Sequence, residues 1–167
     1  NAPLFYEAKV ERNTVALGSV ARAHELRTYR ACDVLVCISD ALRKIVIDEA
    51  KIKDDKIVIM PNGVDTDHFD PSKHTATRYF EGFTIGYIGK LLDSQGLDLL
   101  LNAVHKLRVN QIPLHVTIVG SGPARSSLAA KSQELGLEEV VKFVGQVPGA
   151  EIPAYIAGFD VGYSGQI

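Results

Sequence analysis

Short apolar runs alternate with helical patterns over the second half of the chain, and the turns between them are short. The expected strands are residues 83–89, 114–120, 139–145 and 160–164, and the expected helices are residues 97–107, 123–135 and 151–159. Strands that alternate with helices through short links form βαβ units on a parallel sheet, with right-handed crossovers. We therefore predict an α/β fold built from Rossmann-like parallel sheet units.

The first part of the chain shows the same alternation with fewer elements. Helix-forming residues predict a helix within residues 4–30 and a second one over residues 40–50. Runs rich in β-branched residues predict short strands at 33–39 and 56–60. Ser39 immediately precedes the second helix, so its side-chain oxygen can accept a hydrogen bond from a free amide of the first turn.

A polar stretch separates the two series of elements. Residues 66–80 contain Pro71 and scattered charges, and they follow the turn sequence PNGVD at residues 61–65. We interpret residues 66–80 as an interdomain linker. It would join the end of a first Rossmann-like domain, residues 1–65, to the first half of a second one, residues 81–167.

Composition and charge narrow the class of protein. The 167 residues are 46% hydrophobic and 23% charged, which is ordinary for a soluble globular chain. The net charge of −2 argues against a nucleic-acid partner. No apolar run approaches the roughly 20 residues that a membrane span requires, and no signal peptide is evident. We therefore predict a cytoplasmic protein.

The cysteines and the chain ends add two expectations. Cys32 and Cys37 are too few for a disulfide framework and favour a reducing compartment, and without nearby histidines they make a poor metal site. The chain begins with Asn1 and ends on the strand-like run FDVGYSGQI at residues 159–167. We expect the chain to be a fragment whose last strand is an open sheet edge, through which it can self-associate.

Glycines mark three successive strand ends in the second half. These are Gly86 and Gly89, the stretch GSGP at 120–123, and the stretch GQV at 145–147. Ligands of open parallel sheets bind beyond the carboxyl ends of the strands, where helices starting near Gln95 and Pro123 would direct free amides. Lys90 would add a positive charge. The pattern favours a phosphate-bearing ligand, although glycines at such turns also occur for steric reasons alone.

The remaining polar residues form no catalytic set. The five histidines, His24, His68, His74, His105 and His115, fall in different predicted elements. We expect His115 to be a hydrogen-bonded structural residue in a strand and His105 to lie on the surface. The carboxylates Asp98, Glu134, Glu138 and Glu139 are assigned to solvated faces. Neither a Ser-His-Asp triad nor a catalytic carboxylate pair can be argued.

Taken together, the motifs resemble a family. They are NAPL at 1–4, DVLVCISDALRK at 33–44, IVIMPNGVDTDHFDP at 57–71, TIGYIGKL at 84–91 with GLDLLL at 96–101, IVGSGP at 118–123, and FVGQVPGAEIPAYIAGFDVGYS at 143–164. In this order they resemble a family 4 glycosyltransferase, a retaining enzyme of the GT-B fold that uses a nucleotide-diphosphate sugar. The resemblance implies that the chain spans the end of the N-terminal, acceptor-side domain and the first half of the C-terminal, donor-binding domain.

The resemblance also implies where the donor diphosphate would lie. Gly89 and Lys90 match the loop and the basic residue that hold it. The family usually has a second basic residue at the position of Gln95, which can donate a hydrogen bond but carries no charge. No metal is expected, and no cofactor, because cationic side chains and helix dipoles offset the diphosphate charge.

The nucleoside part of the donor is assigned in the same way. Gly120 and Gly122 match the loop beside the nucleotide, and Gln146 and Val147 match the segment whose backbone lies near the base. The family's paired glutamates would lie beyond residue 167, and its acceptor loop before residue 1. The resemblance thus places no catalytic residue in this chain, which we expect to be inactive on its own.

Two alternatives stay open. The chain could be a non-catalytic nucleotide- or phosphate-binding module or a scaffold. The uncharged Gln95 supports this alternative, because the family usually has a basic residue at that position. It could also be part of a nucleotide-sugar epimerase of similar architecture, against which the PNGVD and GQVP stretches argue. Under the main hypothesis, the partners are a nucleotide-sugar donor and an unknown acceptor, and the parent protein could associate peripherally with a membrane through residues outside this chain.

Overall fold

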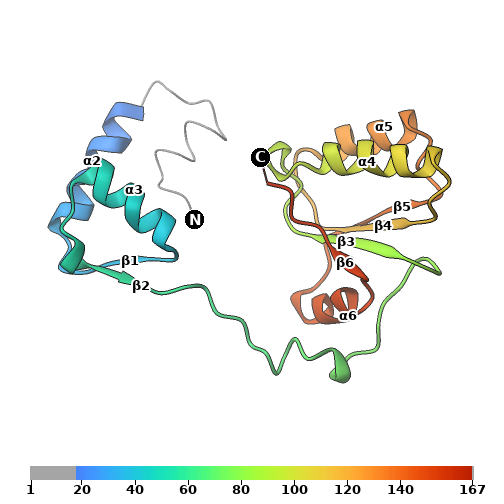
Figure 1. The fold of residues 1–167 in the computed structure, drawn as a ribbon, viewed down its shortest axis with the longest axis horizontal. Helices are drawn as coiled ribbons and strands as arrows, with labels where there is room; N and C mark the ends of the chain where they lie inside the picture. Colours follow the sequence, from blue (N-terminus) through green and yellow to red (C-terminus); the bar gives the residue numbers. More distant parts are fainter. Residues whose placement is uncertain (1–17, 167) are drawn as a thin grey trace. The chain divides into compact units, whose positions relative to one another are not determined.

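The computed structural model describes residues 18–166 and divides the chain into two compact units, one ending at Val64 and the other beginning at Asp65. Each unit consists of parallel strands with helices packed on them (Figure 1). The predicted α/β class with parallel sheets is therefore confirmed. The predicted domain limits, 1–65 and 81–167 with a linker at 66–80, stay a prediction.

The first unit contains a small two-stranded parallel sheet. Its elements are α2 (Gly18–Ala31), β1 (Leu35–Cys37), α3 (Asp40–Ala50), the 3-10 helix η2 (Asp54–Lys56) and β2 (Ile57–Ile59). Strands β1 and β2 pair in parallel. The core of the unit is Cys37, Val46, Ala50 and Ile52. The predicted helix within residues 4–30 is confirmed over α2, and its part before residue 18 lies outside the described residues.

Helix α3 has the boundaries that the sequence predicted. The Ser39 hydroxyl oxygen accepts a hydrogen bond from the amide of Leu42 at 3.2 Å, which caps the first turn. The helix ends at Lys51, whose left-handed backbone (φ 55°) lets its amide donate to the carbonyl oxygen of Ile47. Arg43 forms an ion pair with Asp54, which ties the helix to the turn before β2.

The second unit is a four-stranded parallel sheet in the order β5-β4-β3-β6. Its elements are β3 (Thr84–Ile88), α4 (Leu97–Val109), β4 (His115–Val119), α5 (Arg125–Glu134), β5 (Val141–Gly145), α6 (Ile152–Ala157) and β6 (Val161–Gly162). Helices α4 and α5 cover one face of the sheet and α6 lies on the other (Figure 1). The chain adds strands outward from β3 through β4 to β5, and then crosses back to place β6 on the other side of β3. Because each crossover is right-handed, connections that run in opposite directions along the sheet place their helices on opposite faces.

The core of this unit lies between the sheet and α4. Leu97, Leu100, Leu101 and Val104 are buried on one face of α4, as the sequence predicted, and Leu107 packs beside them partly buried. They meet Val116 and Ile118 of β4 and Leu128 of α5. This packing fixes the carboxyl ends of the strands relative to the helices.

The start of α5 differs from the sequence prediction, whereas α4 begins at Leu97 as predicted. Pro123 was expected in the first turn of a helix, but α5 begins only at Arg125. Residues 120–124 are instead held as a loop, because the amide of Ala124 donates to the carbonyl oxygen of Leu91 at 3.0 Å. Before α4, residues Asp93–Gln95 form a separate 3-10 turn, η4, and Gly96 (φ 62°) reverses the chain into the helix.

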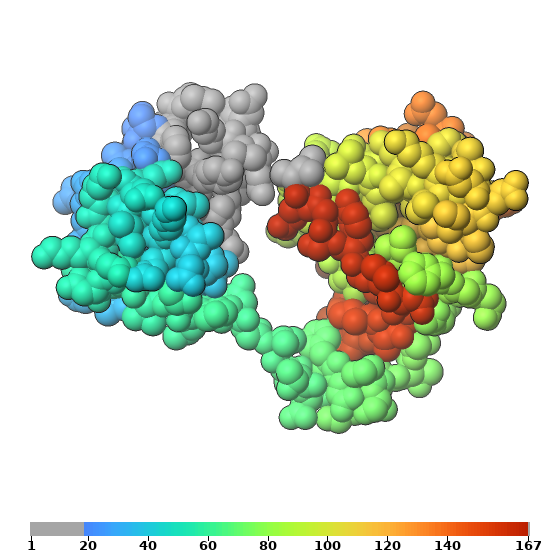
Figure 2. Space-filling model, in the orientation of Figure 1, coloured from blue at the N-terminus to red at the C-terminus, as the bar shows by residue number. Residues whose placement is uncertain are grey.

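The last strand of the second unit is short and lies at the edge of the sheet. Val161 and Gly162 pair with Ile85 and Gly86 of β3. The C-terminal residues, red in Figure 2, lie on the surface of the unit, and Val161 is 47% exposed. An edge of this kind leaves unpaired backbone groups open to solvent.

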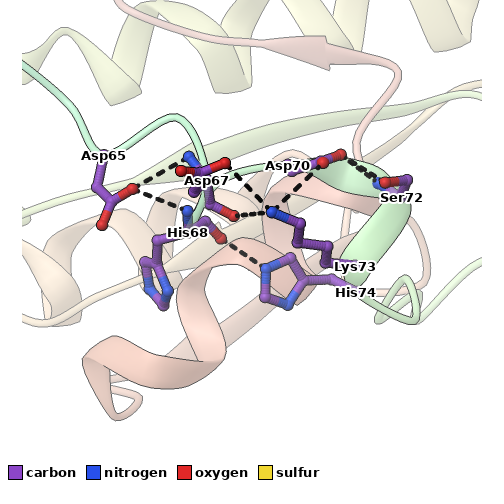
Figure 3. Close-up of polar contacts among 7 residues, drawn as sticks. All are labelled: Asp65, Asp67, His68, Asp70, Ser72, Lys73 and His74. Atoms are coloured by element: carbon purple, nitrogen blue, oxygen red, sulfur yellow. Dashed lines mark hydrogen bonds and ion pairs between the residues drawn. The ribbon is translucent and has the colours of Figure 1, made fainter.

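The segment that precedes β3 carries its own hydrogen bonds. Figure 3 shows an Asp65 carboxylate oxygen accepting from the amides of Asp67 and His68, both at 3.0 Å. Lys73, in the 3-10 helix η3 (Pro71–Lys73), donates to Asp67 and pairs with Asp70. Further along, the amide of Thr77 donates to the carbonyl oxygen of Ala154 in α6 at 2.9 Å. Residues 65–80 are therefore structured against the second unit.

Candidate functional site

Backbone hydrogen bonds join the three glycine-bearing strand ends of the second unit. The amide of Gly89 donates to Val119 at 3.0 Å, and the amide of Gly120 donates to Gly145 at 2.8 Å. One residue further out, the amide of Leu91 donates to Ser121 at 3.0 Å. The loops after β3, β4 and β5 thus form one connected surface at the carboxyl edge of the sheet, where ligands of such sheets bind.

An open cavity of about 640 Å³ lies over these loops. It is lined by Ile88, Gly89, Lys90, Leu92, Val119, Gly120, Ser121, Gly122, Pro123, Gln146, Val147 and Ile152. The structure therefore brings together six of the seven residues that the sequence proposed, namely Gly89, Lys90, Gly120, Gly122, Gln146 and Val147. The seventh, Gln95, is not part of the lining.

Steric contacts explain two of the glycines. The carbonyl oxygen of Gly89 occupies the space that a Cβ atom on Gly120 would need, and Gly120 also has φ 135°. A Cβ atom on Gly122 would meet the backbone of Leu91. Close packing of the backbone therefore explains why glycine is needed at both positions. Because these two residues carry no side chains, backbone atoms form the floor of the cavity there.

The loop after β5 is shaped by a bulge. Ile118 pairs with Phe143 but Val119 pairs with Gly145, so β5 carries one extra residue where it reaches the cavity. Gly145 adopts φ 90°, a conformation that favours glycine. Beyond it, the Ser121 hydroxyl lies 3.4 Å from the side-chain oxygen of Gln146, which links the second and third loops.

Lys90 provides the charge of the cavity. Among the described residues that line it, Lys90 alone has a charged side chain, and it is exposed. Within residues 18–166 its ammonium group has no ion-pair partner, and the amides of Lys90, Ser121 and Gly122 donate to no other group. An unpaired ammonium beside free amides is suited to an anion, because both are donors without acceptors of their own.

Gln95 has a different environment. Its side-chain oxygen lies 3.3 Å from the hydroxyl of Tyr87 and 3.5 Å from the side-chain nitrogen of Gln166. Tyr87 was not singled out from the sequence, because within an apolar strand it has the appearance of a core residue. Ser121 was also missed as a side chain, although it lies inside the glycine stretch that drew attention to the loop.

Two histidine assignments need correction. His115 was expected to be hydrogen-bonded, but its buried Nδ1 has no partner among the described residues, and its ring stacks on Phe80 with centroids 4.5 Å apart. His105 was expected on the surface, but it is half-buried and its Nδ1 lies 3.1 Å from the carbonyl oxygen of Leu135. Neither His105 nor His115 lines the cavity over the three loops.

The acidic residues lie at the surface, and some have partners. Asp98 pairs with Lys131 at 3.9 Å beside a second cavity of about 360 Å³ between α4 and α5. Glu139 is 86% exposed at its side chain and pairs with Arg108 at 3.4 Å. In the described part of the chain, no three His, Cys, Asp or Glu side chains are grouped so that they could hold a metal ion. The expectation that no metal takes part stays a prediction.

No helix among residues 18–166 is both long enough and apolar enough to pass through a bilayer.

Comparison with known proteins gives two family matches. Residues 73–162 match the family described as glycosyl transferases group 1. Residues 6–68 match the family described as glycosyltransferase family 4.

Curated relatives match over part of their own length. A GDP-mannose-dependent alpha-(1-6)-phosphatidylinositol monomannoside mannosyltransferase of Mycolicibacterium smegmatis is 33% identical over 108 residues, which is 61% of this chain and 28% of that protein. Mannosylfructose-phosphate synthase of Agrobacterium fabrum is 29% identical over 145 residues, which is 78% of this chain and 32% of that protein. The chain thus spans 28% of the first relative and 32% of the second.

Solved structures share the fold at low sequence identity. Sucrose-phosphate synthase of Thermosynechococcus elongatus aligns with a TM-score of 0.71 at 18% identity, covering 99% of this chain and 44% of that one. A point mutant of TarM of S. aureus, in complex with UDP among other ligands, aligns with a TM-score of 0.70 at 16% identity, covering 92% of this chain and 30% of that one.

Proposed function

The chain belongs to the glycosyl transferases group 1 family, and from this premise we propose that the protein which carries it transfers a sugar from a nucleotide-diphosphate sugar to an acceptor, with retention. Residues 81–167 would supply part of the donor site. The observation that carries the proposal is the exposed, unpaired Lys90 beside the free amides of Ser121 and Gly122.

The chemistry of the donor fits these groups. Sugar transfer leaves a nucleoside diphosphate, on which negative charge accumulates as the glycosidic bond to phosphate breaks. An ammonium group and fixed amide donors stabilise such charge without having to reorganise during the reaction. Lys90 would hold the diphosphate, and the loop at Gly120 and Gly122 would let it approach the backbone closely. No metal is required in this account.

The base of the nucleotide would lie against the third loop. Gln146 and Val147 border the cavity beside Ile152, and the contact between Gln146 and Ser121 holds that loop against the second one. One relative is named for GDP-mannose and one structural neighbour was crystallised with UDP, so we propose a nucleoside diphosphate while leaving the base open.

Calorimetric titration of the full-length protein with UDP, GDP and ADP tests the proposal. Lys90→Ala should weaken binding of the tightest of these ligands by at least about tenfold, because one charge-assisted contact is lost. Lys106→Ala is the matched control, since Lys106 is an exposed lysine of α4 outside the cavity lining, and it should leave binding unchanged. Equal affinity in wild type and Lys90→Ala would overturn the proposed donor site.

A second candidate is a non-catalytic scaffold. It is favoured by one observation, namely that Gln95 contacts Tyr87 and does not line the cavity, which leaves Lys90 as the one cation there among the described residues. No binding of UDP, GDP or ADP by the wild-type protein at millimolar concentration would support the scaffold and contradict a donor site.

Further partners belong to the same proposal. The acceptor is unidentified, and we propose that the parent protein associates peripherally with a membrane surface through residues outside this chain. We also propose that the 167-residue chain self-associates through the exposed edge at β6. Light scattering of the purified chain should then report a species larger than a monomer, and a monodisperse monomer would contradict self-association.

A further inference from the structure

Tyr87 is buried beneath the loop that carries Lys90. It is 5% exposed, its backbone pairs with Ile118 in the middle of the sheet, and its ring belongs to the core of the second unit. Its hydroxyl nevertheless reaches the carboxyl edge, where it donates to the carbonyl oxygen of Lys90 at 2.8 Å. A buried tyrosine thus holds the backbone of the residue that supplies the charge of the cavity.

Gly89 leaves the space that this contact needs. A Cβ atom on Gly89 would lie 2.8 Å from the Tyr87 hydroxyl oxygen and 3.1 Å from the ring carbon that bears it. The backbone of Gly89 has no positive φ, so it is this space, rather than the conformation, that an alanine would violate. The absence of a side chain at Gly89 therefore leaves room for the Tyr87 hydroxyl to reach the Lys90 carbonyl oxygen.

The same hydroxyl also approaches Gln95. The Gln95 side-chain oxygen lies 3.3 Å from it, at a longer distance than the Lys90 carbonyl oxygen, so one hydrogen is shared unequally between two acceptors. The same Gln95 oxygen also lies 3.5 Å from the side-chain nitrogen of Gln166. Both contacts of Gln95 are thus made by its side-chain oxygen, and the residue is not part of the cavity lining.

We infer that Tyr87 is a positioning residue for the donor diphosphate. Its hydroxyl fixes the backbone of Lys90, so that the ammonium group stays over the cavity. Gln95 is a partner of Tyr87 rather than a second diphosphate ligand. This inference rests on the proposed donor site. An exposed lysine side chain is long and rotatable, and ordering it on binding costs conformational entropy. A fixed backbone reduces the volume that the ammonium group explores, so less of that cost remains to be met when the anion binds.

The test is a set of calorimetric titrations of the full-length protein with UDP, GDP and ADP, using the ligand that binds most tightly. Tyr87→Phe deletes the hydroxyl alone and should weaken binding roughly five- to tenfold, the effect of one lost hydrogen bond. Tyr155→Phe is the matched control. Tyr155 is 7% exposed and its hydroxyl lies 3.3 Å from that of Tyr79, outside the cavity lining, so its loss should leave binding unchanged.

A double-mutant cycle separates positioning from a general structural role. If Tyr87 acts through Lys90, Tyr87→Phe should weaken binding less than about twofold in a Lys90→Ala background, because the ammonium group it positions is absent. Equal weakening by Tyr87→Phe in the wild type and in Lys90→Ala would overturn the inference. Gln95→Ala should leave nucleotide binding within about twofold of wild type, and a loss as large as that caused by Lys90→Ala would overturn the role assigned to Gln95.

Gly89→Ala provides an independent route to the same contact. The added methyl group should displace the Tyr87 hydroxyl and weaken binding, and combining it with Tyr87→Phe should weaken binding no further. Additive losses would contradict the inference. Binding that collapses in Lys90→Ala but is unchanged in Tyr87→Phe would overturn the positioning role while leaving the donor site intact. A wild-type protein that binds none of the three nucleotides would overturn both.

Discussion

The carbonyl oxygen of Gly89 fills the space in which a Cβ atom on Gly120 would have to lie. This contact brings the loop after β3 against the loop after β4, and the hydrogen bond from Leu91 to Ser121 continues it. The two loops can lie this close because Gly120 carries no side chain. The shape of the cavity floor therefore depends on a pair of glycines that are far apart in sequence.

Gly120→Ala should destabilise the protein by about 2–4 kcal/mol, because an alanine meets backbone and also has to adopt φ 135°. Urea denaturation measures the effect. Gly149→Ala is the control, since a Cβ atom there meets nothing within 4 Å and the residue has no positive φ. It should change stability by less than about 0.5 kcal/mol. Similar effects of the two substitutions would contradict the close contact of the loops.

Leu101→Ala should lower the free energy of unfolding by about 2–5 kcal/mol, because Leu101 is 0% exposed and its truncation leaves a cavity between α4 and the sheet. Leu99→Ala lies on the same helix at 49% exposure and should cost little. Chemical denaturation of both variants tests the orientation of α4. If Leu99→Ala were the more damaging change, the assigned buried face would be wrong.

Asp160 should make the stability of the protein depend on pH in the acid range. The hydrogen bond from Arg78, followed by the one from the amide of Thr84, holds the pKa of this carboxyl below its usual value of 3.8. A pKa lowered on folding contributes stability that is present above 3.8 and is lost as the pH falls through the folded value. The stability difference between wild type and Asp160→Asn should therefore shrink as the pH falls below about 4. Urea titrations from neutral to acid pH measure it, and a difference that stays constant would count against this linkage.

Ser39→Ala should destabilise the first unit by about 1 kcal/mol, because the amide of Leu42 loses the oxygen that caps α3. Ser39→Thr keeps an oxygen in the same place and should recover most of the loss. The far-ultraviolet circular dichroism signal during urea denaturation reports the loss of helix and so gives the stability of each variant. Equal losses in both variants would show that the cap oxygen is not the stabilising group.

Several parts of the fold could be predicted because their cause is local. The limits of α3 follow from Ser39 and from the run of helix formers after it, and the buried face of α4 follows from the spacing of its leucines. The glycines at 120 and 122 marked the loop correctly, since the need for glycine is visible in sequence. What the sequence could not supply was the reason, because the atoms that exclude a side chain there belong to Gly89 and Leu91.

Other residues were misread because their environment is made by distant segments. His115 has the periodicity of an ordinary strand residue, and only the packing of Phe80 and the sheet leaves its Nδ1 without a partner among the described residues. Pro123 matches the usual start of a helix, but the contact between Ala124 and Leu91 holds that stretch as a loop.

The sequence by itself determined the alternation of strands and helices, the parallel sheet, the glycine-bearing strand ends and the family, since these depend on periodicity and on residues close together in the chain. Only the tertiary structure decided which polar side chains face the cavity. Within the described residues it left Lys90 unpaired there, and it directed Gln95 to Tyr87 and Gln166. The physical reason is that a side chain takes the hydrogen-bond partners nearest to it in space, and here those partners come from the core of the sheet and from the segment after β6.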